Sequence, residues 1–110
     1  MTAMNLPNVM AALVKAQDNY DSAAYANCFS ETAVVFDEGK VYNGRNEIKK
    51  WIEKANEKYK TVMQPVEYTE TGSTSILAAK ISGTFDGSPV VLKYHFEIAD
   101  GLIQSLKVTG

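Results

Sequence analysis

Asp37 and Tyr94 are the two residues whose types and positions most favour chemistry at a pocket. Asp37 ends the apolar run Ala33–Phe36, and a buried carboxylate is costly unless another group pairs with it or uses it. Apolar surroundings disfavour the charged form of a carboxyl, which raises its pKa towards values that suit a general base. Tyr94 lies in Val90–Ile98, where every second residue is apolar or aromatic. An acid and a phenol that share a pocket could move a proton next to a carbonyl and stabilise the enolate.

Both residues also have ordinary structural interpretations. Asp37 precedes Glu38-Gly39, so its carboxylate could bond the backbone of a turn. Tyr94 could be a core tyrosine whose hydroxyl meets the backbone or water. The pattern alone leaves both interpretations open for each residue.

A second group of residues could line an apolar cavity around this acid. They lie on the inward faces of the expected helices and strands, and aromatic-rich pockets with few polar groups suit flat hydrophobic ligands. The candidates are Leu13, Tyr20, Tyr25, Phe29, Val35, Trp51, Tyr59, Phe85, Leu92 and Phe96. Each could instead be a core residue, and Trp51 in particular lies on an apolar helical stripe.

Other side chains with reactive groups are weaker candidates. His95 is the single histidine, but it alternates with Tyr94 and belongs with Lys93 and Glu97, so we expect it on the outer face of a sheet. Cys28 has no basic neighbour that favours a thiolate, and we expect a small buried hydrophobe. One His and one Cys make a zinc site improbable. We expect no metal and no cofactor, because no phosphate-binding loop or dinucleotide-binding glycine pattern occurs either.

Two helices are expected near the start of the chain. The first runs from about Asn5 or Leu6 to Asn19, with Asn5 as a cap and Pro7 in the first turn. The second runs from about Ser22 to Phe29, and Asp21 is well placed as its N-cap.

A third helix, 45–59, is the clearest element. Asn43-Gly44 breaks the chain just before it. Apolar residues then recur at helical spacing, at Ile48, Trp51, Ile52, Ala55 and Tyr59. We interpret the lysines and glutamates between them as a solvated face, supported in part by Lys49 with Glu53 at i,i+4.

Strands account for the rest of the chain. Short strands are expected at Ala33–Phe36 and Lys40–Tyr42, and from Thr61 onward the apolar period drops to two. Four residues of the first later strand would share one face, namely Val62, Gln64, Val66 and Tyr68. Pro65 implies an edge or a bulge there, Gly83 a further bulge, and Asp86-Gly87 a tight hairpin.

Helices followed by strands predict a single α+β domain, residues 1–110, rather than alternating βαβ units. The expected architecture is a cone-shaped barrel: a curved, mostly antiparallel sheet wrapped around a pocket, with three helices from the N-terminal half. The net charge of −2, with 11 basic residues, makes nucleic acid a poor partner. No apolar run approaches the roughly 20 residues that span a bilayer. Met1–Pro7 lacks the pattern of a signal peptide, and a single cysteine fits a reducing cytoplasm.

The sequence resembles the SnoaL-like branch of the nuclear transport factor 2-like superfamily over nearly its whole length. The resemblance is carried by Asp21…Tyr25…Cys28-Phe29, Val35–Gly39, Tyr42–Arg45…Ile48…Trp51, Gly83–Pro89, Leu92–Phe96 and Ile103…Leu106. It implies a cone-shaped α+β barrel, often dimeric through the outer sheet face. Similar proteins include ketosteroid isomerases, polyketide cyclases, epoxide hydrolases and non-catalytic binding domains, so the fold cannot choose a reaction.

The resemblance also bears on single positions. Asp37 falls where similar ketosteroid isomerases carry their general-base aspartate, and Tyr94 falls where they carry a protonated acid in the oxyanion hole. Leu13 departs from the pattern, because it falls where that family has its oxyanion tyrosine. The three-residue set of similar epoxide hydrolases is not found, since Arg45 is the single arginine.

The sequence therefore favours a small cofactor-free enzyme of isomerase or cyclase type that acts on a hydrophobic carbonyl compound. A non-catalytic ligand-binding or scaffold domain is the alternative, motivated by Leu13. A third possibility is a protein-interaction module, but the outer sheet face is of mixed polarity and suits self-pairing as a homodimer better. That face is expected to carry Ile76, Ala78, Val91 and His95.

Overall fold

A computed structural model of the protein describes residues 6–72 and 74–110. Within these residues it has three helices, α1 (Asn8–Asp18), α2 (Ser22–Asn27) and α3 (Gly44–Tyr59). The strands in the same part of the chain are β1 (Phe29–Asp37), β2 (Lys40–Asn43), β3 (Val62–Thr71), β4 (Thr74–Ser82), β5 (Val90–Ala99) and β6 (Leu102–Thr109). Of these helices, none is both long and apolar enough to cross a bilayer.

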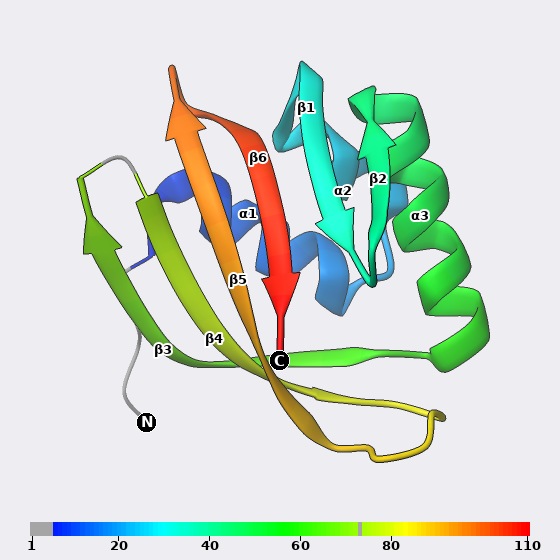
Figure 1. Cartoon of the computed structure of the whole chain (residues 1–110). Coiled ribbons are helices and arrows are strands. Elements are labelled where there is room, and N and C mark those ends of the chain that lie inside the picture. The colour runs from blue at the N-terminus through cyan, green and yellow to red at the C-terminus, as the bar shows by residue number, and fades with distance from the viewer. Residues whose placement is uncertain (1–5, 73) are drawn as a thin grey trace.

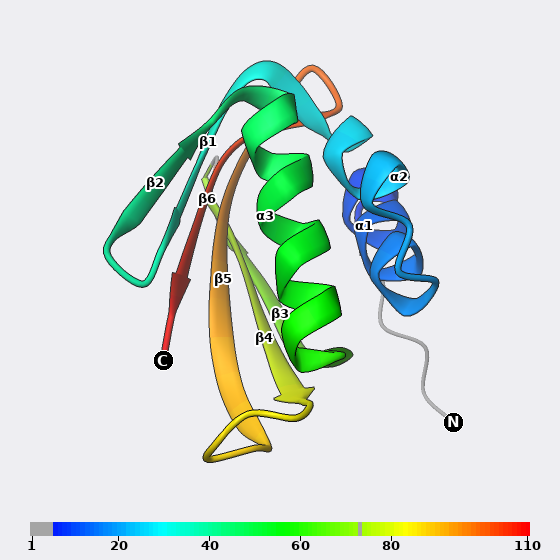
Figure 2. The same cartoon turned by 90° about the vertical axis from the view of Figure 1, so that its right-hand side faces the viewer.

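The strands form one curved sheet in the order β2-β1-β6-β5-β4-β3 (Figure 1). Neighbouring strands are antiparallel except for β1 and β6, which are parallel. Figure 2 shows the three helices on one side of this sheet, with α3 running along its hollow face. The sheet does not close on itself, and the α+β cone that the sequence predicts is confirmed.

The first two helices are shorter than expected. α1 begins at Asn8 because the Pro7 carbonyl already accepts bonds from the amides of Met10 and Ala11, at 3.0 and 2.9 Å; Asn5 lies outside the described residues. The predicted cap of α2 is confirmed, since the Asp21 carboxylate accepts from the Ala24 amide at 3.0 Å. Phe29 belongs to β1 rather than to α2, where it pairs with β6.

α3 begins at Gly44, one residue before the predicted start. Gly44 has a φ of +81°, which suits glycine, and the Glu47 carboxylate accepts from the Asn43 amide at 3.0 Å. Ile48 and Ile52 are buried beneath it. Glu53 accepts a hydrogen bond from the Ser22 hydroxyl at 3.2 Å and so turns towards α2, and its support by Lys49 stays a prediction.

β3 confirms the predicted bulge but not the predicted inward face. The register between β3 and β4 shifts between Pro65 and Glu67, on the edge strand of the sheet. Met63 is the buried residue here, whereas Val62 and Val66 are 54% and 55% exposed. Simple alternation fails in this strand because a bulge adds one residue and changes which side chains point inward.

β4 and β5 alternate as predicted. β4 buries Leu77, Ala79 and Ile81, and β5 buries Tyr94 and Phe96. His95 faces the other way, and its Nε2 lies 2.9 Å from the Thr109 hydroxyl. That outer face also holds half-exposed apolar side chains such as Val91, and self-pairing through it stays a prediction.

The connection between β4 and β5 is longer than the predicted two-residue hairpin. It spans residues 83–89 and leans on the end of α3, where the Thr84 amide and hydroxyl bond the carbonyls of Tyr59 and Lys58 at 2.7 and 3.2 Å. Gly83 permits this approach, since a Cβ there would lie 2.5 Å from the Tyr59 carbonyl oxygen. Gly83 therefore marks a close contact and not the bulge that the sequence suggested.

Substituting Gly83 with alanine is expected to destabilise the fold by about 1–3 kcal/mol, because the added methyl group overpacks a rigid backbone contact. Urea denaturation measures this free energy of unfolding. Gly110→Ala is the matched control, since its Cβ would meet no atom within 4 Å. Equal stability of the Gly83→Ala variant and the parent would contradict the close contact.

Candidate functional site

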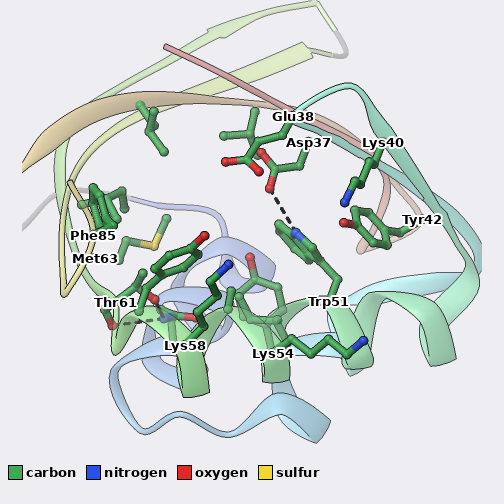
Figure 3. A pocket seen from close by; sticks show the side chains of 18 of the residues that line it. Asp37, Glu38, Lys40, Tyr42, Trp51, Lys54, Lys58, Thr61, Met63 and Phe85 are labelled. Carbon is green, nitrogen blue, oxygen red and sulfur yellow. Dashed lines mark hydrogen bonds between the residues drawn. The ribbon is translucent and has the colours of Figure 1, made fainter. Parts of the chain in front are cut away.

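An open cleft of about 1120 Å³ lies between α3 and the hollow face of the sheet. Figure 3 shows its side chains converging from the strands on one side and α3 on the other. The sheet contributes apolar walls, among them Met63, Ile81, Leu92 and Val108. The lining also holds four lysines and four acids, so the cleft combines apolar walls with charged side chains.

Asp37 lines this cleft from the end of β1. Its Oδ2 accepts a hydrogen bond from the Trp51 indole Nε1 at 3.1 Å (Figure 3). Burial raises the pKa of the Asp37 carboxyl, the Trp51 bond partly offsets this rise, and the negative charge of Glu38 adds to it. The predicted turn role is not what the side chain does here: the carboxylate bonds a helix side chain across the cleft.

Tyr94 lines the same cleft from the middle of β5. It is 9% exposed, and its ring stacks on Phe96 with centroids 6.3 Å apart. Burial and the nearby Asp37 charge both raise the pKa of the Tyr94 phenol. The phenol therefore stays neutral at physiological pH and keeps its proton available for donation.

The register of the sheet explains why Asp37 and Tyr94 lie level with each other. Tyr94 pairs with Val108 on β6, and Lys107 pairs with Phe36 on β1. Asp37, the next residue of β1, is thus level with Tyr94 two strands away, roughly 10 Å between backbones at the usual strand spacing. Both side chains line the cleft, and the Asp37 charge acts on the Tyr94 phenol.

Tyr25 brings a second phenol to this place. It lies on α2, is only 2% exposed and lines the cleft. Burial raises its pKa well above the ordinary tyrosine value, and Tyr94, Cys28 and Asp37 each raise it further. Three acidic groups, Asp37, Tyr25 and Tyr94, therefore influence one another electrostatically within one region of the cleft.

An aromatic cluster supports the indole that holds Asp37. The Trp51 ring lies 6.2 Å from that of Tyr25 and 5.8 Å from that of Tyr42, centroid to centroid. Tyr25 in turn contacts Phe29 in the core at 5.8 Å. These contacts fix the indole N–H in the direction of the carboxylate, which gives Trp51 a positioning role.

Replacing Trp51 with phenylalanine is expected to raise the pKa of Asp37 further, because the hydrogen bond that favours the ionised form is lost. A titration of the Asp37 carboxyl carbon by ¹³C NMR measures this pKa. Tyr42→Phe, which keeps the ring beside Trp51, serves as the control and should leave it unchanged. An unchanged or lower pKa in Trp51→Phe would show that the indole does not stabilise the carboxylate.

The structure divides the other predicted cavity residues into two groups. Those that line the cleft are Tyr25, Trp51, Tyr59, Phe85 and Leu92. Those that do not are Leu13, Tyr20, Phe29, Val35 and Phe96. The predicted binding roles of the first group stay predictions.

The second group corrects the sequence interpretation. Leu13, Phe29, Val35 and Phe96 are fully buried in the core cluster between the helices and the sheet. Tyr20 follows the end of α1 with a φ of +51° and is 46% exposed. Inward periodicity cannot tell a core residue from a cavity wall, since both face the same way.

Gln17 is a cleft residue that sequence reasoning missed. Its side chain is 5% exposed, and Nε2 donates to Asn56 Oδ1 at 2.8 Å and to Thr61 Oγ1 at 3.0 Å. This network ties α1 to α3 and to the start of β3 at one end of the cleft. A glutamine on the apolar face of the first helix was the available signal.

No trio of His, Cys, Asp or Glu side chains within residues 6–72 and 74–110 is arranged to hold a metal ion. Cys28 is buried, and its thiol lies 3.5 Å from the Ala24 carbonyl. Arg45 Nε donates to the Phe29 carbonyl at 2.7 Å. Both residues therefore have local structural contacts.

No protein-family model and no curated protein matches the sequence. Solved structures do match. A Sinorhizobium meliloti protein that is provisionally named a polyketide cyclase shares 36% sequence identity, with a TM-score of 0.94 over 99% of this chain and 100% of that chain. The chain belongs to the SnoaL-like branch of the nuclear transport factor 2-like superfamily.

Two further structures share the fold of this SnoaL-like protein at lower identity. A Catenulispora acidiphila protein with a ketosteroid isomerase-like fold, in complex with trimethylamine, is 16% identical with a TM-score of 0.85, over 96% of this chain and 87% of that chain. The epoxide hydrolase/cyclase-like enzyme SalBIII, which has a role in pyran ring formation in the polyether salinomycin, is 22% identical with a TM-score of 0.74, over 91% and 85%. Both likenesses concern the fold alone.

Proposed function

We propose that this SnoaL-like protein is a cofactor-free enzyme of isomerase or cyclase type that transfers a proton on a hydrophobic carbonyl compound. The observation that carries the proposal is that the half-buried carboxylate of Asp37 and two buried phenols line the same cleft, beside apolar walls. The relative provisionally named a polyketide cyclase supports the same reaction class.

Asp37 is the base in this proposal. Trp51 holds Oδ2, which leaves Oδ1 to take a proton from the carbon next to the substrate carbonyl. The electrons of that C–H bond form the C=C bond of an enolate, and the negative charge moves to the former carbonyl oxygen. The raised pKa of Asp37 strengthens it as a base, since a carboxylate near its ordinary pKa accepts a carbon-bound proton poorly.

Tyr94 and Tyr25 are the donors to the enolate oxygen. Their raised pKa values keep both phenols protonated, and neutral, buried donors stabilise developing negative charge without reorganisation. Tyr25 offsets the absence of a phenol at Leu13, which is fully buried and lies away from the cleft.

The enolate has two outcomes in the proposed reaction class. In a substrate with a C=C bond beyond the deprotonated carbon, the enolate is a dienolate, and return of the proton from Asp37 to its far carbon completes an isomerisation. Attack of the enolate carbon on a second carbonyl of the same molecule closes a ring through a new C–C bond, and the resulting alkoxide takes up the proton. Either course regenerates the Asp37 carboxylate.

Hydrogen exchange tests the proposal without knowledge of the natural substrate. Ketones with an aromatic body, such as 2-acetonaphthone, and cyclic enones are incubated with the protein in D₂O, and deuterium at the carbon next to the carbonyl is followed by NMR. We expect saturable exchange above the buffer rate. Ligands that bind in the cleft but exchange only at the buffer rate would instead support the alternative, a binding domain without turnover.

A further inference from the structure

Three lysines form a row along the cleft side of α3. Lys50, Lys54 and Lys58 follow one another at intervals of four residues, which places them on one helix face. All three are exposed and line the cleft, together with Lys40 from β2. The row spans about 12 Å at the helical rise per residue. The sequence pattern had indicated only a solvated face here.

α3 carries three acids, Glu47, Glu53 and Glu57, and of these only Glu47 lines the cleft beside the row. Glu53 turns towards α2, where it accepts from the Ser22 hydroxyl, and Glu47 accepts from the Asn43 amide at the start of the helix. The cleft acids besides Asp37 and Glu47 are Glu38 and Asp86, which lie on the two turns opposite. Figure 3 shows Lys54 and Lys58 on the α3 side of the opening and Lys40 on the β2 side.

Cations at the opening and apolar walls within define an amphipathic site. Among the described residues there is one cation–π pair, in which the Lys58 ammonium lies 5.1 Å from the centroid of the Tyr59 ring. Tyr59 packs edge-on against Phe85, which continues the wall into the cleft. Three lysines grouped along one side of the opening attract an anion to that side.

We infer that the cleft takes an amphipathic anion, with its apolar carbonyl-bearing body inside and a carboxylate or phosphate group against the row of Lys50, Lys54 and Lys58. The inference rests on the proposed function and names the substrate class for it. The anion lies on the α3 side of the opening, while the carbonyl contacts Tyr94 and Tyr25 on the other walls.

Binding of three matched probes tests this assignment. The probes are 2-naphthylacetate, its neutral methyl ester and 2-naphthyl phosphate, which share a ring system and differ in charge. Their dissociation constants are measured by tryptophan fluorescence at low and high salt. Comparing 2-naphthylacetate with 2-naphthyl phosphate shows whether the site prefers a carboxylate or a phosphate group.

We expect at least one anion to bind about tenfold more tightly than the ester at low salt, as the sum of several exposed charge contacts. High salt should remove most of that preference. The variant Lys50→Gln/Lys54→Gln/Lys58→Gln should lose the preference and keep the ester affinity. The control Lys15→Gln/Lys49→Gln/Lys93→Gln changes the net charge equally at residues away from the cleft, and it should keep the preference.

Three results would overturn the inference. Equal affinities for the ester and both anions would do so, as would an anion preference that survives in the cleft variant or falls equally in the control. Ester binding with deuterium exchange would still support the proposed proton transfer in each of these cases. Failure of exchange with intact anion preference would refute the reaction and leave the anion site.

Discussion

Replacing Asp37 with asparagine is expected to slow hydrogen exchange and turnover by about 10²–10⁴-fold, the usual contribution of a positioned general base. Asparagine keeps the shape of the side chain but cannot take the proton. Ligand affinity should change little, because the cleft walls stay in place. Rates under saturating 2-acetonaphthone, with binding measured separately, give both quantities.

The same substitution should stabilise the fold at neutral pH. Because the pKa of Asp37 is raised in the folded protein, the folded state holds its proton more tightly than the unfolded chain. This contribution to stability is fully present below the unfolded pKa and is lost as pH rises through the folded pKa. Calorimetry should therefore show a higher Tm for Asp37→Asn than for the parent at pH 7 and a smaller difference near pH 3.

Together these effects distinguish a catalytic carboxylate from a structural one. If Asp37 is catalytic, the Asp37→Asn variant should exchange hydrogen more slowly than the parent and be more stable at pH 7. A variant that is less stable at pH 7, or that exchanges hydrogen at the parent rate, would contradict the assigned role.

Replacing Tyr94 with phenylalanine is expected to lower kcat by about 10²–10³-fold, the usual cost of removing one donor to a developing oxyanion. The ring and its stacking on Phe96 are kept, so folding should not be impaired. Tyr25→Phe should act in the same direction, and the double variant should lose less than the product of the two, since both donors serve one oxygen. Steady-state kinetics of all three variants measure these effects.

Tyr59→Phe is the matched control for the phenols. Tyr59 also lines the cleft, but it packs against Phe85 near the end of α3. Its hydroxyl should be dispensable for kcat. Equal losses in Tyr59→Phe and Tyr94→Phe would mean that any phenol removal perturbs the cleft, and the oxyanion role would fail.

The sequence predicts the elements that carry a strong local signal. The apolar stripe of α3 and the chain break at Asn43-Gly44 predict the helix to within one residue of its observed start. The inward alternation of β5 predicts Tyr94 as a buried residue and His95 as an outer one. These features depend on neighbouring residues only, so periodicity suffices for them.

Features that depend on distant contacts could not be predicted. The hydrogen bond from Trp51 to Asp37 joins α3 to β1. The Tyr25 phenol lines the same cleft as Tyr94 because α2 places it there. That the lysine row borders a cleft also depends on the fold and could not be predicted. Helical spacing puts those lysines on one face, but it does not say what that face borders.

If Asp37 and the two phenols form one site, a single NMR titration should show one ligand reaching all three. The carboxyl carbon of Asp37 and the phenol carbons of Tyr25 and Tyr94 are observed while 2-naphthol, a mimic of an enolised ketone, is added. We predict that all three signals shift with the same midpoint concentration of ligand. Shifts of the tyrosine signals with an unmoved Asp37 signal, or midpoints that differ between them, would contradict a single site.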